Sequence, residues 1–174
     1  MIRDHNSATI ILLLNDLIEA DMVHTVSTDT FTCGPFSVQI KRRDKGEPDI
    51  TQATLIIHRK ENNPREVELF QIVCRDLPDA KVLCRLIDLI FTRISMSNDP
   101  VTVVSSDGAK NCGLFCAFAN AVSSMKIDEK ADIFQLARLL LLRRHEFFKH
   151  FEEYRLCHEA LHVYLESANI YANF

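Results

Sequence analysis

The sequence has no long apolar run, no excess of positive charge and no secretory leader, and each absence excludes a class of protein. The longest strongly apolar runs are Ile10–Leu14 and Leu139–Leu142, whereas a helix needs about 20 apolar residues to cross a bilayer. The 174 residues carry a formal net charge of −4, so no general basic surface is available for nucleic acid. The opening residues Met1–His5 lack the hydrophobic region of a signal peptide. We therefore expect no nucleic-acid partner and no direct membrane insertion.

The length and composition predict a single domain, residues 1–174, with an apolar core, since 47% of the residues are hydrophobic. Six cysteines are scattered along the chain, at Cys33, Cys74, Cys84, Cys112, Cys116 and Cys157. Without a secretory leader, we interpret them as free thiols in a reducing compartment, so the expected location is cytoplasmic. Nothing in the sequence requires a cofactor.

The first half of the chain is rich in strand patterns. Four segments are short apolar runs or alternate between apolar and polar residues: Thr9–Leu14, Phe36–Lys41, Thr54–His58 and Val67–Val73. We expect the last three to form an antiparallel meander, with turns at Gly46–Pro48 and Asn62–Pro64. Residues 21–33 are polar and are interpreted as irregular.

The second half is dominated by helix patterns. Apolar residues recur at helical spacing in Val82–Ile94, and further helices are predicted near Asp132–Leu142 and Phe151–Leu165. Together the two halves indicate the mixed α/β class, a mixed sheet with helices on its faces.

The most informative stretch is a strand, a glycine-containing loop and a helix in direct succession. Val101–Val104 has the β-branched residues of a buried strand, Ser105–Gly113 is a polar loop, and a helical apolar pattern begins at Leu114. This arrangement directs backbone N–H groups and the helix dipole at one point, which is how a protein binds an anion. The Lys and Ser/Thr of a nucleotide-binding P-loop are absent after Gly113, and no G-x-S-x-G nucleophile motif is present.

The loop and several other segments resemble the protein tyrosine phosphatases, whose signature is H-C-S-A-G-x-G-R-T-G between a strand and a helix. Segments outside the loop carry the same resemblance: Met1–Leu12, Asp132–Leu142, Phe148–Cys157 and Asn169–Phe174. The last of these is most similar to the end of the second, membrane-distal and inactive domain of receptor-type enzymes. The resemblance covers nearly all of this chain but only the later part of a phosphatase domain. It implies a twisted mixed sheet flanked by helices, with the N-terminal part of the domain missing and apolar surface left uncovered.

The resemblance also assigns site positions. The family's nucleophilic Cys falls on Ser105, its phosphate-binding Arg on Asn111, and its general acid on Asp76. The two water-positioning glutamines fall on Lys149 and Glu153. The remaining phosphate-loop positions are Ser106, Asp107, Gly108, Ala109, Lys110, Cys112 and Gly113.

These replacements remove the groups on which the family's chemistry depends. A Ser105 hydroxyl is a weak nucleophile without an activating base, and Asn111 cannot form the charged, bidentate fork that Arg offers a phosphate. The Trp and Pro that hinge the acid loop are absent around Asp76. The Asp107 carboxylate either lies in the field of the helix N-terminus, where it would repel a phosphate, or points outward into solvent.

The resemblance therefore implies a catalytically inactive phosphatase domain that acts as a regulatory or protein-interaction module in phosphotyrosine signalling. The partners it implies are proteins: an active phosphatase domain of the same parent chain or phosphotyrosine-signalling proteins. The parent would be a single-pass membrane receptor, with this part on the cytoplasmic side. Arg143, Arg144 and Lys149 would flank the loop, facing an acidic partner or serving as solvated helix-end charges.

Two enzyme alternatives stay open at this point. One is an active phosphotyrosine hydrolase with an unusual nucleophile such as Cys112. The other is a zinc hydrolase, because residues 158–162 read H-E-A-L-H on a predicted helix, with His158 and His162 as ligands, Glu159 as base and Glu166 as the only nearby downstream carboxylate.

We predict no stoichiometric zinc on this helix, because His158 and His162 lack a convincing third ligand. Elemental analysis of protein purified without chelators measures this directly. One tightly held zinc per chain that disappears in His162→Ala would overturn the prediction.

Overall fold

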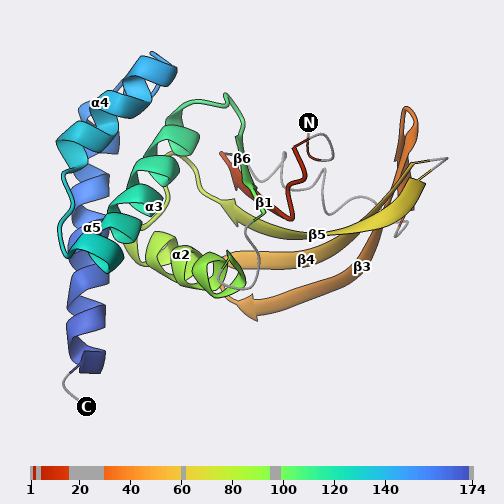
Figure 1. The fold of residues 1–174 in the computed structure, drawn as a ribbon, viewed down its shortest axis with the longest axis horizontal. Coiled ribbons are helices and arrows are strands. Elements are labelled where there is room, and N and C mark those ends of the chain that lie inside the picture. Colours follow the sequence, from red (N-terminus) through yellow and green to blue (C-terminus); the bar gives the residue numbers. More distant parts are fainter. Residues whose placement is uncertain (1, 3–4, 16–29, 60–61, 95–98, 173–174) are drawn as a thin grey trace. The chain divides into compact units, whose positions relative to one another are not determined.

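The computed structural model describes residues 2, 5–15, 30–59, 62–94 and 99–172. These residues divide into two compact units, coloured by sequence in Figure 1. The first unit comprises Met1–Asp76 with Ile94–Val104, and the second comprises Leu77–Arg93 with Ser105–Phe174. The sheet belongs to the first unit, apart from Ser105 at the end of β6, and the described helices belong to the second, apart from Ile94 at the end of α2.

The first unit is built on an open sheet with the strand order β2-β3-β4-β5-β1-β6. Its strands are β1 (Thr9–Leu14), β2 (Thr30–Cys33), β3 (Phe36–Glu47), β4 (Ile50–Arg59), β5 (Asn62–Val73) and β6 (Val101–Ser105). From β2 to β5 neighbouring strands pair antiparallel, whereas β1 pairs with β5 in parallel. The predicted fold class, α/β with a mixed sheet, is confirmed, and so is the antiparallel meander of β3, β4 and β5.

Strand β1 lies in the interior of the sheet because it is apolar on both faces. Ile11 and Leu13 are 0% and 1% exposed, and Ile10 is buried on the opposite face. Strands buried on both faces read as continuous hydrophobic runs, which is the pattern of Thr9–Leu14.

One face of the sheet carries the apolar core of the first unit. Its buried members are Ile10, Ile40, Ala53, Val67 and Leu69, with Ile2, Leu12, Leu55, Ile57 and Val104 packed against them. The hydroxyls of Ser7 and Thr102 lie 2.7 Å apart and connect the residues before β1 to β6.

Strand β2 was not predicted, and its position explains why. It is an edge strand of only four residues, all of them exposed, so the short alternation of Thr30–Cys33 does not mark a half-buried face. The turn to β3 places Gly34 at φ +57°, a left-handed conformation that favours glycine. The rest of the segment interpreted as irregular, residues 21–29, lies outside the described residues.

The turn predicted at Asn62–Pro64 is wrong, because β5 begins at Asn62 and pairs there with Arg59. The register shifts between Ile57 and Arg59, so the ladder is irregular beside Pro64. A strand tolerates proline at such a bulge, since proline has no N–H to donate. The predicted turn at Gly46–Pro48 lies slightly too early, because β3 continues to Glu47.

The second unit consists of helices, whose labels follow Figure 1. They are α2 (Ala80–Ile94), α3 (Lys110–Asp128), α4 (Ile133–Arg143) and α5 (Phe151–Ala172). Two of them begin after an aspartate whose carboxylate accepts backbone N–H bonds. Asp79 accepts from Lys81 N at 2.8 Å, and Asp132 accepts from Gln135 N at 3.0 Å. Among the described residues, no helix has the length and apolar character to cross a bilayer.

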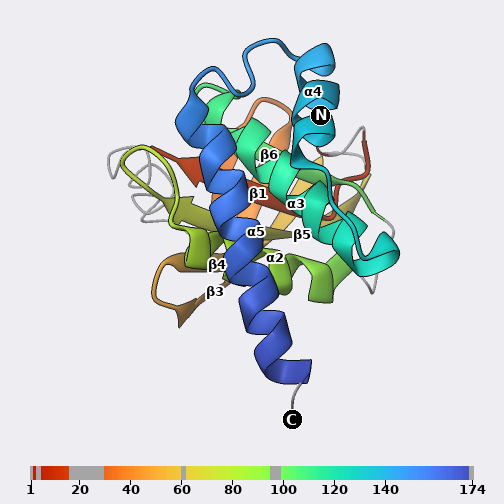
Figure 2. The ribbon, with the colours of Figure 1, turned by 90° about the vertical axis from the view of Figure 1, so that its left-hand side faces the viewer.

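Helix α3 is the centre of the second unit and packs against both α4 and α5 (Figure 2). Its side chains Leu114, Phe118, Ala121 and Val122 have no exposed surface. The Phe118 ring meets Tyr164 of α5 edge to face, with 6.4 Å between the ring centroids. This packing holds α3, including its first turn at Lys110, in a defined position within the second unit.

We expect Phe118→Ala to lower the free energy of unfolding by about 3–5 kcal/mol, because it leaves a cavity beside Tyr164 in a fully buried position. Phe134→Ala is the matched control, since Phe134 is 60% exposed and should change stability by less than about 0.5 kcal/mol. Chemical denaturation measures both. Equal losses in the two variants would contradict this assignment of the core.

Candidate functional site

The loop that joins β6 to α3 is a tight turn of four residues, Ser106–Ala109. It is closed by a 3.0 Å hydrogen bond from Gly108 N to Ser105 O. Gly108 adopts φ +65°, which other residues rarely adopt, so the glycine is required by the backbone. The helix begins at Lys110, earlier than predicted, so residues 110–113 form its first turn instead of belonging to the loop.

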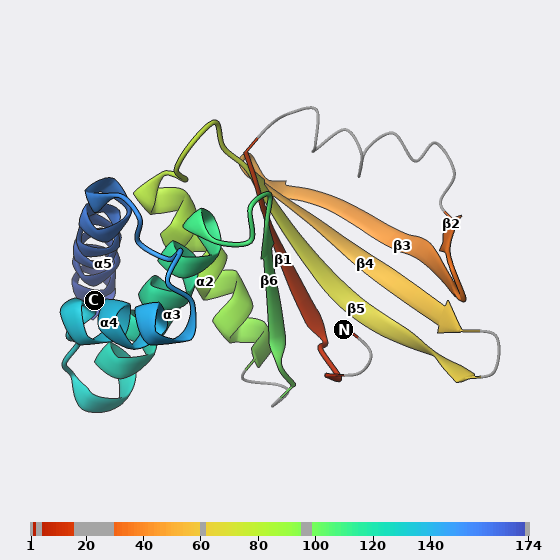
Figure 3. The same cartoon turned by 90° about the horizontal axis from the view of Figure 1, so that it is seen from above.

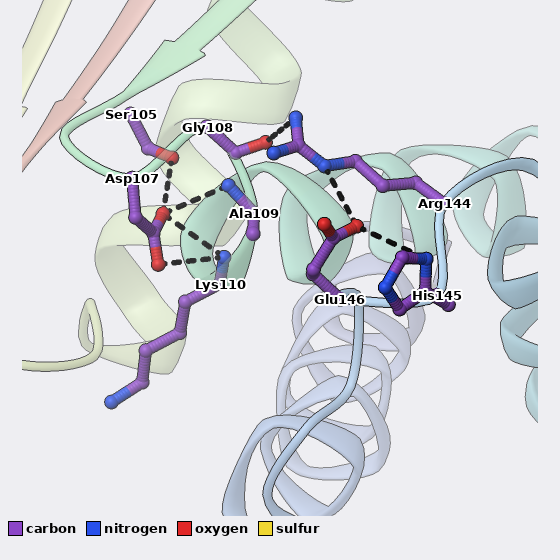
Figure 4. Close-up of polar contacts among 8 residues, drawn as sticks. All are labelled: Ser105, Asp107, Gly108, Ala109, Lys110, Arg144, His145 and Glu146. Carbon is purple, nitrogen blue, oxygen red and sulfur yellow. Dashed lines mark hydrogen bonds and ion pairs between the residues drawn. The ribbon is translucent and has the colours of Figure 1, made fainter.

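The Asp107 carboxylate occupies the N-terminus of α3 (Figure 4). It accepts hydrogen bonds from Ala109 N at 2.8 Å and from Lys110 N at 3.2 Å, both to Oδ1. Burial alone would raise the pKa of this carboxyl, but the hydrogen bonds from these amides and from Ser105 lower the pKa below its ordinary value. Of the two orientations left open by the sequence, the structure shows the one in which Asp107 lies in the field of the helix.

Ser105 and Cys112 are joined to the same carboxylate. The Cys112 thiol donates to Ser105 Oγ at 3.3 Å, and the Ser105 hydroxyl donates to Asp107 Oδ1 at 3.1 Å. Burial raises the pKa of the Cys112 thiol, so this group is a protonated donor at neutral pH. The three side chains form a hydrogen-bonded chain that ends on the Asp107 carboxylate.

A turn between α4 and α5 contacts this loop from 36 residues further along the chain. Arg144 Nη1 donates to Gly108 O at 2.6 Å, and Arg144 Nε lies 3.3 Å from Glu146 Oε2 (Figure 4). His145 Nδ1 lies 3.6 Å from the same Glu146 oxygen. Arg144 was expected to flank the loop, and the structure confirms that it reaches it.

The same turn explains the second glycine. A Cβ on Gly113 would lie 2.8 Å from Cγ of Phe147, closer than side chains tolerate. Gly113 is therefore needed for the close approach of Phe147 to the first turn of α3, not for an unusual backbone conformation. The sequence analysis assigned Gly113 to the loop because the spacing of Gly108 and Gly113 is similar to the spacing of the glycines in phosphate-binding loops.

The predicted glutamine positions differ in their surroundings. Lys149 is exposed, whereas Glu153 has no exposed surface. Glu153 Oε1 accepts from His150 N at 3.3 Å, and within the described structure its Oε2 has no hydrogen-bond partner. Burial raises the pKa of the Glu153 carboxyl, and the His150 amide only partly offsets this. Sequence reasoning placed Glu153 at the site but did not foresee that its carboxylate would be buried.

The other predicted residues fall as follows. Asn111 is buried at 1% exposure in the first turn of α3, and Ser106 is exposed. Asp76 is exposed at the end of the first unit. Glu146 and Phe147 were not singled out by sequence reasoning, because only the turn after α4 brings them to residues 105–113.

The H-E-A-L-H segment lies on α5, and each of its polar side chains contacts another side chain of the same helix. Glu159 pairs with Arg155 at 3.3 Å, and His162 pairs with Glu166 at 3.2 Å. The His158 ring packs edge to face on Tyr154. Over the described ranges, no group of three His, Cys, Asp or Glu side chains is placed to hold a metal ion. All six cysteines are free thiols.

We expect Asp107→Ala to lower the free energy of unfolding by about 0.5–2 kcal/mol at neutral pH, a cost similar to that of losing a helix cap, because it removes the acceptor of the Ala109 and Lys110 amides. Because the pKa of Asp107 is lower in the folded protein, its contribution is complete above pH about 4 and is lost as the pH falls through the folded-state pKa. Asp128→Ala, at the other end of α3, is the control and should not destabilise, because a helix C-terminus disfavours negative charge.

Glu153→Gln should show the opposite pH dependence. The raised pKa means that the charged carboxylate destabilises the folded protein, so Gln should gain stability over the wild type as the pH rises above about 4.3. Below that pH the gain should vanish. The free energy of unfolding of the wild type, Asp107→Ala and Glu153→Gln, measured across pH 3–8, tests both dependences. If the difference from the wild type changed with pH in the same direction for both variants, the two assigned pKa shifts would be contradicted.

Comparison with known proteins places this site in a family. The family model described as protein-tyrosine phosphatase matches residues 1–162. Receptor-type tyrosine-protein phosphatase alpha of Mus musculus is 27% identical over 148 residues, which cover 81% of this chain and 18% of that protein. Receptor-type tyrosine-protein phosphatase C of Homo sapiens is 25% identical over 144 residues, which cover 75% of this chain and 11% of that protein.

A third relative extends the match along the chain. Receptor-type tyrosine-protein phosphatase zeta of Homo sapiens is 22% identical over 171 residues, or 92% of this chain and 7% of that protein. The chain therefore spans less than a fifth of the length of these relatives. Because the family match runs from residue 1 to residue 162, the chain belongs to the protein tyrosine phosphatase family.

Proposed function

We propose that this chain is a catalytically inactive protein tyrosine phosphatase domain that serves as a regulatory or protein-interaction module in phosphotyrosine signalling. The observation that carries the proposal is the Asp107 carboxylate, which accepts the Ala109 and Lys110 amides at the N-terminus of α3. In a phosphatase, amides of this kind bind the phosphoryl oxygens. Here the protein's own anion takes their hydrogen bonds.

Electrostatics supports the proposal. Two unit charges about 4 Å apart repel by about 4 kcal/mol at an effective dielectric of about 20, and a phosphate carries more than one charge. The lowered pKa of Asp107 keeps its carboxylate ionised at neutral pH. A phosphorylated ligand would have to displace Asp107 or accept this repulsion.

The candidate nucleophiles are also unsuited to attack on phosphorus. The Ser105 hydroxyl donates to Asp107, whose lowered pKa makes it a weak base, so this pair does not activate the hydroxyl. Cys112 is 6% exposed and its pKa is raised by burial, so almost no thiolate is present at neutral pH. This weakens the alternative of an active enzyme that uses Cys112.

Asn111 takes the position of the family's phosphate-binding arginine. The Arg144 guanidinium reaches the loop, but it donates to Gly108 O and pairs with Glu146. In this position it stabilises the backbone of the loop and shares its charge with a carboxylate. We infer that Arg144 positions the loop between β6 and α3.

The relatives support the cellular setting that we propose. All of those compared are receptor-type phosphatases, so we infer a cytoplasmic location within a larger membrane receptor. The proposed partners are an active phosphatase domain of the same parent chain or phosphotyrosine-signalling proteins. Arg143 and Lys149 are exposed and are available to an acidic partner surface.

We expect no measurable hydrolysis of a phosphotyrosine peptide by the wild-type chain. Ser105→Cys should stay inactive, because Asn111 still replaces the clamp and Asp107 still occupies the amides. A phosphate-release assay with an active family member as the positive control measures both proteins.

The same assay identifies the alternatives. Turnover by the wild type that disappears in Cys112→Ala would establish Cys112 as a nucleophile. Turnover that disappears in Ser105→Ala would establish Ser105 instead, and either result would overturn the proposed inactivity.

A further inference from the structure

Helix α4 carries large apolar side chains on the side that faces away from its neighbour α3. Phe134, Leu139 and Leu142 are 60%, 59% and 77% exposed, whereas Ile133 and Ala137 are buried. Figures 1 and 3 show α4 at the margin of the second unit with α3 on one side. A helix that packs on one side only is expected to be polar on its free side, so α4 departs from the usual pattern.

Two arginines share this free side with the apolar residues. Phe134, Arg138 and Leu142 are four residues apart and form one row along the helix. Leu139 and Arg143 form the adjacent row, and both arginines are exposed. We call these five residues the α4 outer face. No acidic residue occurs anywhere between Ile133 and His145.

The interleaved charges disfavour a lipid surface as the occupant. A helix that lies in a membrane interface separates its apolar residues from its charged residues on opposite faces. In α4 the arginines lie between the exposed apolar residues, and the opposite side is buried in the second unit. Immersing the apolar residues in lipid would therefore immerse the arginines as well.

A second copy of the chain is disfavoured by the same charges. A two-fold dimer centred on the α4 outer face would bring the same residues of the two helices together, whether the helices run parallel or antiparallel, and Arg138 lies at the middle of α4. Each Arg138 would then face its own counterpart, and like charges brought together at an interface oppose association.

We propose that the α4 outer face binds an amphipathic helix of a partner protein, one that carries carboxylates beside its apolar residues. The apolar residues of the partner would cover Phe134, Leu139 and Leu142. Its carboxylates would pair with Arg138 and Arg143, which are separated by about 7.5 Å along the helix axis. Charge complementarity selects this occupant, because α4 presents two positive charges and no negative ones.

This proposal goes beyond the inactive loop, because it uses none of residues 105–113 and would hold whether or not the chain hydrolyses phosphotyrosine. It identifies the surface on which an interaction module would act. It also names the partner's chemistry: an acidic amphipathic helix.

The test is selection from a library of randomised helical peptides displayed on phage, with the whole chain as the target. We expect the enriched peptides to place Asp or Glu beside Leu, Met or Phe on one helix face. Their affinity should fall at least about tenfold in Phe134→Ser and in Leu142→Ser, as is usual for a central apolar contact. Phe31→Ser, which alters an exposed aromatic residue on β2, is the matched control and should bind as the wild type does.

Charge reversal gives an independent readout. Arg138→Glu combined with Arg143→Glu should lose the acidic peptides and instead select peptides with Lys or Arg at the same positions. Circular dichroism and thermal unfolding of each variant establish that it is folded. These substitutions lie at exposed positions, where stability changes are small.

Four results would overturn the proposal. The first is that selection enriches no helical peptide, and the second is that the enriched peptides bind Leu142→Ser and the wild type equally. The third is sedimentation of the chain with phosphatidylserine vesicles that is lost in Leu142→Ser, which would assign the face to a lipid surface. The fourth is a dimer in sedimentation velocity that is lost in Leu142→Ser, which would assign the face to a second copy.

Discussion

The organisation of the site depends on one interaction, the hydrogen bonds from the first amides of α3 to the Asp107 carboxylate. The N-terminus of a helix leaves several amides without partners in the helix, and it attracts negative charge. A phosphate-binding loop leaves these amides to the ligand. In this chain Asp107 accepts the amides of Ala109 and Lys110, and the hydroxyl of Ser105 donates to the same carboxylate. The loop is therefore satisfied internally, and stability is gained at the place where a phosphatase holds its substrate.

The turn between α4 and α5 stabilises this arrangement from outside the loop. Arg144 donates to the carbonyl of Gly108, and Phe147 packs so closely on Gly113 that a side chain there would collide with it. Gly108 and Gly113 therefore each have a structural function in this chain. A sequence can retain the geometry of a phosphate loop for this reason alone, because the geometry also holds the start of α3 in place.

The two carboxylates of the site have opposite electrostatic character. Asp107 is exposed and stabilised as an anion, whereas Glu153 is fully buried and its pKa is raised. A buried carboxylate with an unsatisfied oxygen costs stability, and glutamine at the same position would avoid the charge. The folded protein thus favours the anion at Asp107, before α3, and disfavours the anion at Glu153, in α5. The interaction proposed for the α4 outer face depends on neither carboxylate.

The sequence by itself determined the fold class, because apolar periodicity depends on local residue order. It located Thr9–Leu14 as a buried strand and residues 101–122 as a strand, a loop and a helix in succession, and the structure has both. It did not find β2, because the alternation of Thr30–Cys33 covers only four residues and these are all exposed. It took Asn62–Pro64 for a turn, whereas in the structure Pro64 lies in β5 at an irregularity of the ladder with β4, which local residue order does not reveal. Only the tertiary structure decided the orientation of Asp107 and the packing of Phe147 on the start of α3. These contacts depend on where a helix and a turn distant in the chain come to lie, and local residue order carries no record of that.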